Sequence, residues 1–98
     1  MTTLSSMEGS IEFNEAAFKH GIAEKDIRCA FAYSVFDHPM AGEEEKHLLI
    51  GFDTKANLLE ILYNVIGDLK INVFHAMECR KNWRKYAEKQ EGYNGTDD

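Results

Sequence analysis

The chain lacks the features that would assign it to a membrane, disulfide-stabilised or zinc-binding class. No apolar run approaches the roughly 20 residues that span a bilayer, and residues 1–6 have neither the basic flank nor the apolar stretch of a signal peptide. Cys29 and Cys79 show no metal-ligand spacing, and the four histidines form no close pair that suits zinc. The sequence therefore predicts a cytoplasmic protein that uses no metal or cofactor, makes no membrane contact and buries both thiols.

Basic residues are also few. Eleven lysines and arginines stand against 17 acidic residues, which gives a net charge of −6 and disfavours a nucleic-acid partner. Residues 1–9 and 88–98 hold five of the acids and one lysine, so the remainder carries 12 acids and 10 bases, a net of −2. Four of those bases lie between Arg80 and Lys85. The sequence thus places one basic segment on an otherwise acidic chain.

The length allows one domain with a single modest core, because the chain has 98 residues. A hydrophobic fraction of 44% is typical of globular chains and not of disordered ones. The periodic part of the sequence begins near Ile11 and ends near Glu88. We therefore expect one domain over residues 11–88, between a flexible N-terminus (1–10) and a flexible acidic C-terminus (89–98).

The first half of the domain predicts two helices. Asn14 is a suitable N-cap for a helix that Gly21 ends, and apolar residues share one face of a second helix over 23–32. The only proline, Pro39, predicts a bend that closes this half. Residues 40–45 come next as an acidic loop, whose glutamates we interpret as a solvated turn in preference to a metal site.

The second half predicts strands. Alternation along the last of them places His75 on one face with Ile71 and Val73. Short polar turns between consecutive strands favour an antiparallel meander. The strands cover residues 46–52, 58–66 and 70–75, and the turns lie at 53–57 and at Gly67-Asp68.

A final helix is expected over residues 76–88. Its inward face would carry Ala76, Cys79, Trp83 and Tyr86, and its opposite face the basic residues. The predicted fold class is therefore α+β in two layers: two N-terminal helices, an antiparallel three- to four-stranded meander, and a C-terminal helix packed on the sheet.

Four motifs occur in an order that resembles the BrnT-like toxins. Phe13-Asn14-Glu15-Ala16 followed by Lys19-His20-Gly21 resembles that family's opening Phe-x-Trp-Asp-Glu-Ala and Lys-His-Gly. Phe36-Asp37-His38-Pro39 is similar to its Phe-Asp-Asp-Pro, and Leu48-Leu49-Ile50-Gly51-Phe52 is similar to its Ile-Gly strand. A last strand that leads into a basic helix closes both patterns, and the similarity covers residues 11–88.

The resemblance implies a RelE-like fold and the toxin role of a type II toxin–antitoxin system. Such a toxin cleaves RNA, free or on the ribosome, and thereby arrests translation. A cognate antitoxin, often a ribbon-helix-helix DNA-binding protein, would neutralise it in a toxin–antitoxin hetero-oligomer.

Cleavage of RNA without a metal requires a base for the 2′-hydroxyl, cations for the phosphate and an acid for the leaving oxygen. His75, at the end of the last strand, is the candidate base or acid. Arg80 and Arg84 lie four residues apart and would share a helix face that contacts the phosphate. Lys81 and Lys85 would attract the RNA backbone.

Each candidate also has a purely structural interpretation. Next to Ile71 and Val73, His75 would be a hydrogen-bonded, partly buried strand residue. The basic helix face would be solvated or would bind an acidic partner segment. Lys19 and His20 suit the C-terminal dipole of the first helix, and only the resemblance gives them an RNA-binding role.

Two features favour another class, a non-catalytic protein-interaction domain or an inactivated toxin of the same fold. BrnT-like chains are markedly basic, whereas this chain is acidic. Their last strand commonly runs into Ser-Ala-Arg, and here His75-Ala76-Met77 places methionine where the arginine would be.

If the strand over 46–52 lies at a sheet edge, its unpaired backbone groups would favour a homodimer.

Overall fold

The computed structural model describes residues 11–90, with side chains up to Tyr86. The predicted flexible ends, 1–10 and 89–98, lie outside this range except for residues 89–90, which belong to the last helix. No helix within it is long and apolar enough to cross a membrane. The elements in chain order are β1 (Ile11–Phe13), the 3-10 helix η1 (Glu15–Phe18), α2 (Glu24–Ala32), β2 (Ser34–Met40), β3 (Glu43–Phe52), β4 (Leu58–Gly67), β5 (Lys70–Glu78) and α3 (Lys81–Gln90).

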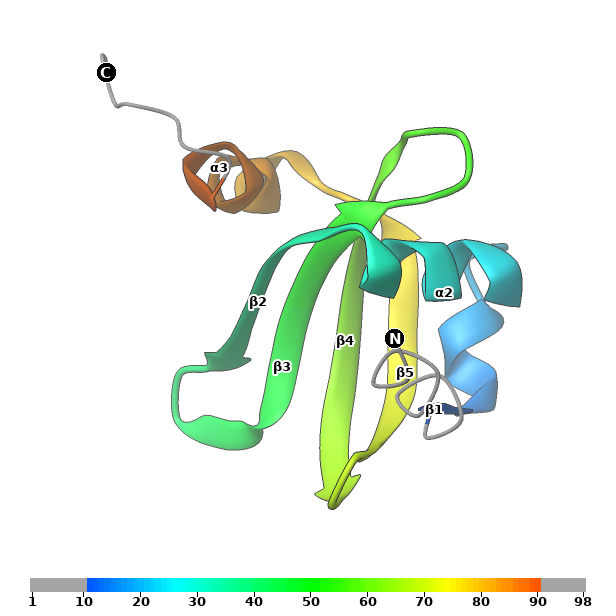
Figure 1. Cartoon of the computed structure of the whole chain (residues 1–98), viewed down its shortest axis with the longest axis vertical. Coiled ribbons are helices and arrows are strands. Elements are labelled where there is room, and N and C mark those ends of the chain that lie inside the picture. Colours follow the sequence, from blue (N-terminus) through cyan, green and yellow to red (C-terminus); the bar gives the residue numbers. More distant parts are fainter. Residues whose placement is uncertain (1–10, 91–98) are drawn as a thin grey trace.

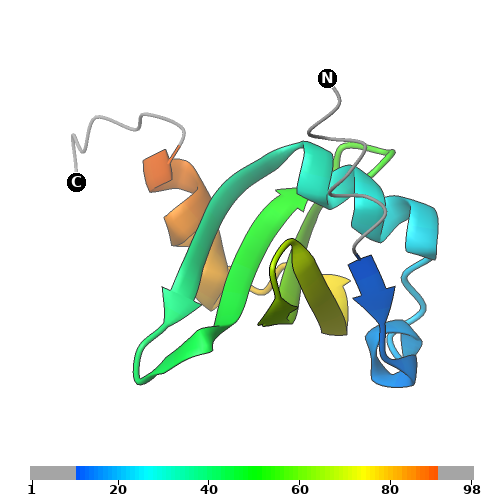
Figure 2. The ribbon, with the colours of Figure 1, turned by 60° about the horizontal axis from the view of Figure 1, so that its bottom comes forward.

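The structure is α+β, with a five-stranded mixed sheet in the order β1-β5-β4-β3-β2 (Figure 1). Strands β3 to β5 form the predicted antiparallel meander, β2 extends it by a strand that was not predicted there, and β1 adds to β5 in parallel. Helices α2 and α3 lie on opposite sides of the sheet (Figure 2). The α+β class is therefore confirmed, but the sheet is mixed and has one more strand than expected, and helices on both faces make three layers where two were predicted.

The α2 side of the sheet holds the larger core. Ile27 and Ala30 of α2 are fully buried against side chains of β3, β4 and β5. The helix approaches β3 closely at Gly51, where a Cβ atom would overlap the Ala30 carbonyl. Glycine at position 51 is therefore the residue that allows α2 to pack directly on the strand.

The α3 side holds a second, smaller core, so the prediction of a single core is wrong. Leu48, Ile50 and Cys79 are buried there, and Trp83 and Tyr86 of α3 pack against them. These contacts confirm that Trp83 is a packing residue and that Cys79 is buried. Cys29 is only half-buried, so the prediction for that thiol is confirmed in part.

The first predicted helix is wrong in type. Residues 11–13 form a strand whose ladder continues as Asn14 N–H donates to the Val73 carbonyl. Asn14 does cap the next turn of the chain, since its side chain accepts from Ala16 N–H, but only the four-residue η1 forms. The N-terminal half therefore has one α-helix, not two.

The predicted bend and acidic loop are also wrong. Pro39 lies inside β2, an edge strand, where a missing N–H is tolerated because no further strand of the described sheet pairs there. The glutamate run begins β3, which starts at Glu43 and not at residue 46. Because β3 lies between β2 and β4, the strand expected at an edge is internal.

The largest local error is at the junction of the last strand and helix. β5 continues to Glu78, and α3 begins only at Lys81, so Ala76 and Glu78 are strand residues. Tyr63 pairs with Val73 and the adjacent Leu62 pairs with His75, which leaves Phe74 as an extra residue. This β-bulge turns His75 onto the α3 side, away from Ile71 and Val73.

Candidate functional site

The chemistry-bearing side chains gather around Glu60, in the middle of β4. Its neighbours Leu59 and Ile61 point into the α2-side core, so Glu60 faces the α3 side. The side chain is 1% exposed. Its carboxylate accepts from His75 Nε2 at 2.9 Å and from Arg80 at three atoms: backbone N at 3.0 Å, Nε at 3.1 Å and Nη2 at 2.7 Å.

These hydrogen bonds keep Glu60 ionised. Burial alone would raise the pKa of this carboxyl, but the hydrogen bonds from Arg80 and His75 outweigh it, and the pKa lies below the usual 4.5. The same contact raises the pKa of Arg80. An ionised carboxylate can only accept, so Nε2 of His75 carries a proton and, in the neutral ring, Nδ1 carries a lone pair.

His75 is held in one orientation but remains accessible. Its side chain is 20% exposed, and Nε2 is fixed by Glu60. The ring of His20 meets it edge to face, with ring centroids 5.5 Å apart and planes at 73°. The structure therefore brings together two imidazoles that lie 55 positions apart in the sequence.

The predicted basic residues divide into those at this site and those on the surface. Arg80 is at the site, with a side chain 53% exposed. Arg84 lies one helical turn further, and its Nε donates to the Cys79 carbonyl at 3.1 Å. Lys81 and Lys85 are exposed on α3, and Lys19 is exposed beyond η1.

Cys79 is adjacent to the site and is chemically inert. Burial, with the nearby Glu60 carboxylate, raises the pKa of its thiol to about 11. The thiol donates to the Arg80 carbonyl, with sulfur and oxygen 3.6 Å apart. A protonated, buried thiol is not a nucleophile.

Sequence reasoning missed Glu60, because strand alternation marks it only as a polar residue between apolar ones. The available indication was its setting in Leu58-Leu59-Glu60-Ile61-Leu62, where leucine and isoleucine surround a carboxylate. A charge buried in such a segment is retained only with a partner.

A second polar cluster on the α2 side was also missed. Tyr63 hydroxyl donates to the Asp37 carboxylate, at 2.8 and 3.0 Å from its two oxygens. His47 Nδ1 lies 3.3 Å from Asp37 Oδ1, and its ring stacks on Tyr63 with centroids 4.9 Å apart. Burial and the Asp37 carboxylate raise the pKa of Tyr63 above its usual range. Tyr63 itself is buried.

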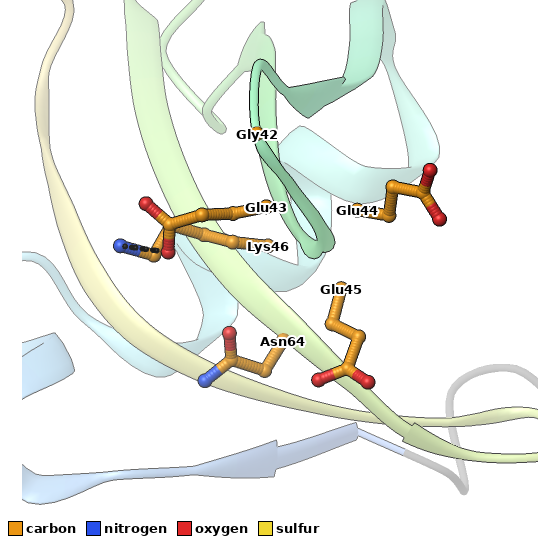
Figure 3. Close-up of a pocket in the computed structure, with 6 residues that line it drawn as sticks. All are labelled: Gly42, Glu43, Glu44, Glu45, Lys46 and Asn64. Atoms are coloured by element: carbon orange, nitrogen blue, oxygen red, sulfur yellow. Dashed lines mark ion pairs between the residues drawn. The ribbon is translucent and has the colours of Figure 1, made fainter.

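The glutamate run lines a shallow depression of about 510 Å³ (Figure 3). Glu43 pairs with Lys46 at 3.2 Å, whereas the carboxylates of Glu44 and Glu45 point in other directions (Figure 3). Within residues 11–90, no group of three or more histidine, cysteine or acidic side chains is arranged to hold a metal ion. The run is therefore the solvent-exposed start of β3.

Comparison of the chain with models of known protein families, with curated protein sequences and with solved structures finds no match. The resemblance to BrnT-like toxins therefore stays a prediction, and functional inference depends on the geometry of the site.

Proposed function

We propose that this protein is an endoribonuclease of the toxin type, neutralised by a cognate antitoxin protein. The observation that carries the proposal is the group formed by His75, Glu60 and Arg80: an accessible imidazole oriented by a buried carboxylate, with a guanidinium on the same carboxylate. A base fixed by a carboxylate beside a cation is the combination that RNA transesterification requires.

In the proposed reaction, Nδ1 of His75 takes the proton of a ribose 2′-hydroxyl. The 2′-oxygen then forms a bond to the adjacent phosphorus while the bond from phosphorus to the 5′-oxygen breaks. His20, whose ring contacts that of His75, protonates the leaving 5′-oxygen. The products are a 2′,3′-cyclic phosphate and a free 5′-hydroxyl.

Arg80 would stabilise the negative charge that accumulates on the phosphate. Its Nε and Nη2 are engaged by Glu60, but Nη1 makes no hydrogen bond within the described residues, and the side chain is 53% exposed. Arg84, together with Lys81 and Lys85 on α3, would attract the RNA backbone electrostatically.

A non-catalytic interaction domain is the second candidate. The pairing with Glu60 neutralises much of the Arg80 charge, which weakens phosphate binding. A separate depression of about 390 Å³ between β2 and α3 is lined largely by apolar residues, including Phe36, Met40 and Trp83. A lining of this kind is typical of a surface that packs against another protein.

Expression in a bacterial host and incubation of the purified protein with RNA test the proposal together. We expect growth arrest and cleavage that persists in EDTA, both lost in His75→Ala. His47→Ala is the matched control, because it removes the histidine of the other cluster and should leave both effects intact. Harmless expression of folded protein that leaves RNA uncut would contradict the nuclease and support the interaction domain.

A further inference from the structure

A pocket of about 420 Å³ opens beside His20, at the edge of the proposed site. Ligand pockets in proteins typically measure about 300–1,000 Å³, so this one has room for a single nucleobase. Its apolar part is formed by Ile22, Leu59 and Met77. Because His20 lines the pocket and also contacts the His75 ring, a base bound here would lie next to the proposed reaction centre.

The polar part of the pocket is rich in acceptors. It consists of the side chains of Asp53, Asn57 and Glu78. Oδ1 of Asp53 accepts from the backbone N–H groups of Lys55 and Asn57, which fixes the loop before β4. Within residues 11–90, no hydrogen bond engages Asp53 Oδ2, the Asn57 amide or the Glu78 carboxylate, so all three remain available to a ligand.

We propose that this pocket binds guanine, and that the enzyme therefore cleaves RNA next to guanosine. This inference rests on the proposed function for its substrate, and it adds the specificity. Guanine presents N1–H and N2–H₂ side by side on its Watson–Crick edge, which a carboxylate accepts bidentately, and O6 next to them can accept from the Asn57 amide.

The other three bases fit this lining less well. Adenine and cytosine each offer a single amino group beside a ring acceptor, and uracil offers one N–H between two carbonyl oxygens. A carboxylate placed opposite those acceptors would repel them and remain partly unpaired. Discrimination therefore comes from the two acidic side chains, while Leu59 and Met77 contribute contact that any base can use.

Binding of nucleoside monophosphates to the full chain tests the pocket without requiring catalysis. We expect GMP to bind at least roughly tenfold more tightly than AMP, CMP or UMP, which is the discrimination that one good bidentate pair gives. Glu78→Gln and Asp53→Asn should each reduce this preference. Asparagine keeps an acceptor oxygen for the loop, and a thermal melt verifies that each variant is folded. Glu44→Gln removes the same charge from a distant strand end and should change nothing.

Equal binding of the four nucleotides would overturn the inference, and so would a GMP preference that survives both pocket variants. A GMP preference in a protein that does not cleave RNA would leave the pocket standing and refute the nuclease. Cleavage with no preference for guanosine would refute the pocket and leave the nuclease standing. Mapping the cut sites on an RNA of balanced composition reads out this last case.

Discussion

The sheet carries a histidine–carboxylate pair on each face, and the two pairs differ in the surroundings of the carboxylate. On the α3 side, Glu60 is 1% exposed and is bound by Arg80 as well as by His75. On the α2 side, Asp37 is 41% exposed and is bound by the Tyr63 hydroxyl as well as by His47. A buried carboxylate needs a cation to remain charged, whereas a hydrated one is satisfied by a neutral hydroxyl.

This difference assigns the two pairs different roles. Glu60 keeps its charge inside the protein, where it fixes the His75 tautomer, and Arg80 adds positive charge at the same place. Asp37 and Tyr63 instead connect β2 to β4 across β3, and Phe31 of α2 packs on Tyr63 with ring centroids 5.3 Å apart. We therefore expect the first pair to matter for activity and the second for stability.

The largest effect is expected from the two carboxylates, exchanged for their amides. Glu60→Gln presents an N–H₂ group to His75 Nε2, which favours the wrong tautomer, so RNA cleavage should fall by about a hundredfold or more. Asp37→Asn makes the equivalent change in the other pair and should leave the cleavage rate unchanged. Initial rates on one RNA substrate measure both. Equal losses in the two variants would remove the proposed difference in role.

The next largest effect concerns α2, which covers the side of the sheet that holds Asp37 and His47. Gly51→Ala forces a methyl group into the Ala30 carbonyl, and we expect the free energy of unfolding to fall by about 2–3 kcal/mol. Gly67→Ala is the control, since its Cβ would meet only Lys70 Cβ at 3.8 Å, and a change within about 0.5 kcal/mol is expected. Urea unfolding compares them. A stable Gly51→Ala protein would show that α2 does not pack directly on β3.

The Arg80 contact can be broken with a predictable pH dependence. In Arg80→Met, buried Glu60 loses its cation, burial then raises the pKa of Glu60, and the melting temperature at pH 7 should fall by about 5 °C or more. The ionised, paired Glu60 of the native protein stabilises the fold above the ordinary carboxyl pKa, and this stabilisation is lost as the pH falls through the lowered value. The deficit of the variant should therefore shrink from pH 7 towards pH 4.

Arg84→Met is the matched variant for this experiment. It removes an arginine four residues further along the chain, in α3, whose Nε donates to the Cys79 carbonyl and not to Glu60. Its melting temperature should show no comparable convergence with that of the native protein at low pH. If the melting temperatures of both variants changed with pH in the same way, Arg80 would not be the group that keeps Glu60 ionised.

The smallest effect belongs to Tyr63. Tyr63→Phe removes the hydroxyl that donates to Asp37, and because Asp37 is exposed to water, the cost should be only about 1 kcal/mol. The raised pKa of Tyr63 also means that folding favours its protonated form, so stability declines as the pH rises above 10.0, the ordinary value. Tyr63→Phe should lose that component, and Tyr33→Phe, whose ring is 65% exposed, should retain it. If the stability of the two variants fell equally as the pH rose above 10.0, the Tyr63 hydroxyl would have to be exposed to water.

The sequence predicted elements well where the signal is local. The alternation of β4, the cap at Asn14 and the second helix depend on neighbours a few positions away, and the structure confirms them. The first helix, the bend at Pro39 and the start of α3 were predicted wrongly. In each case strand pairing overrode the local preference: β1 joined β5 60 positions later, β5 continued along β4 as far as Glu78, and Pro39 paired with His47 of the next strand.

The site shows the same division. The sequence indicated His75 and Arg80 as site residues. It did not indicate Glu60, whose carboxylate binds both of them. Nor does any local pattern indicate that His20 contacts the His75 ring, because the two residues lie 55 positions apart. Contacts between such distant positions leave no periodic trace.

By itself, the sequence determined which residues alternate along β4 and which are apolar enough to be buried, since side-chain spacing and hydrophobicity are properties of the chain. The face that His75 occupies was decided only by tertiary structure. One extra residue, Phe74, bulges from the ladder between β4 and β5, and it reverses every later side chain of β5. With this bulge, Val73 and Ala76 are both buried on the α2 side although they lie three residues apart, and His75 between them faces the α3 side.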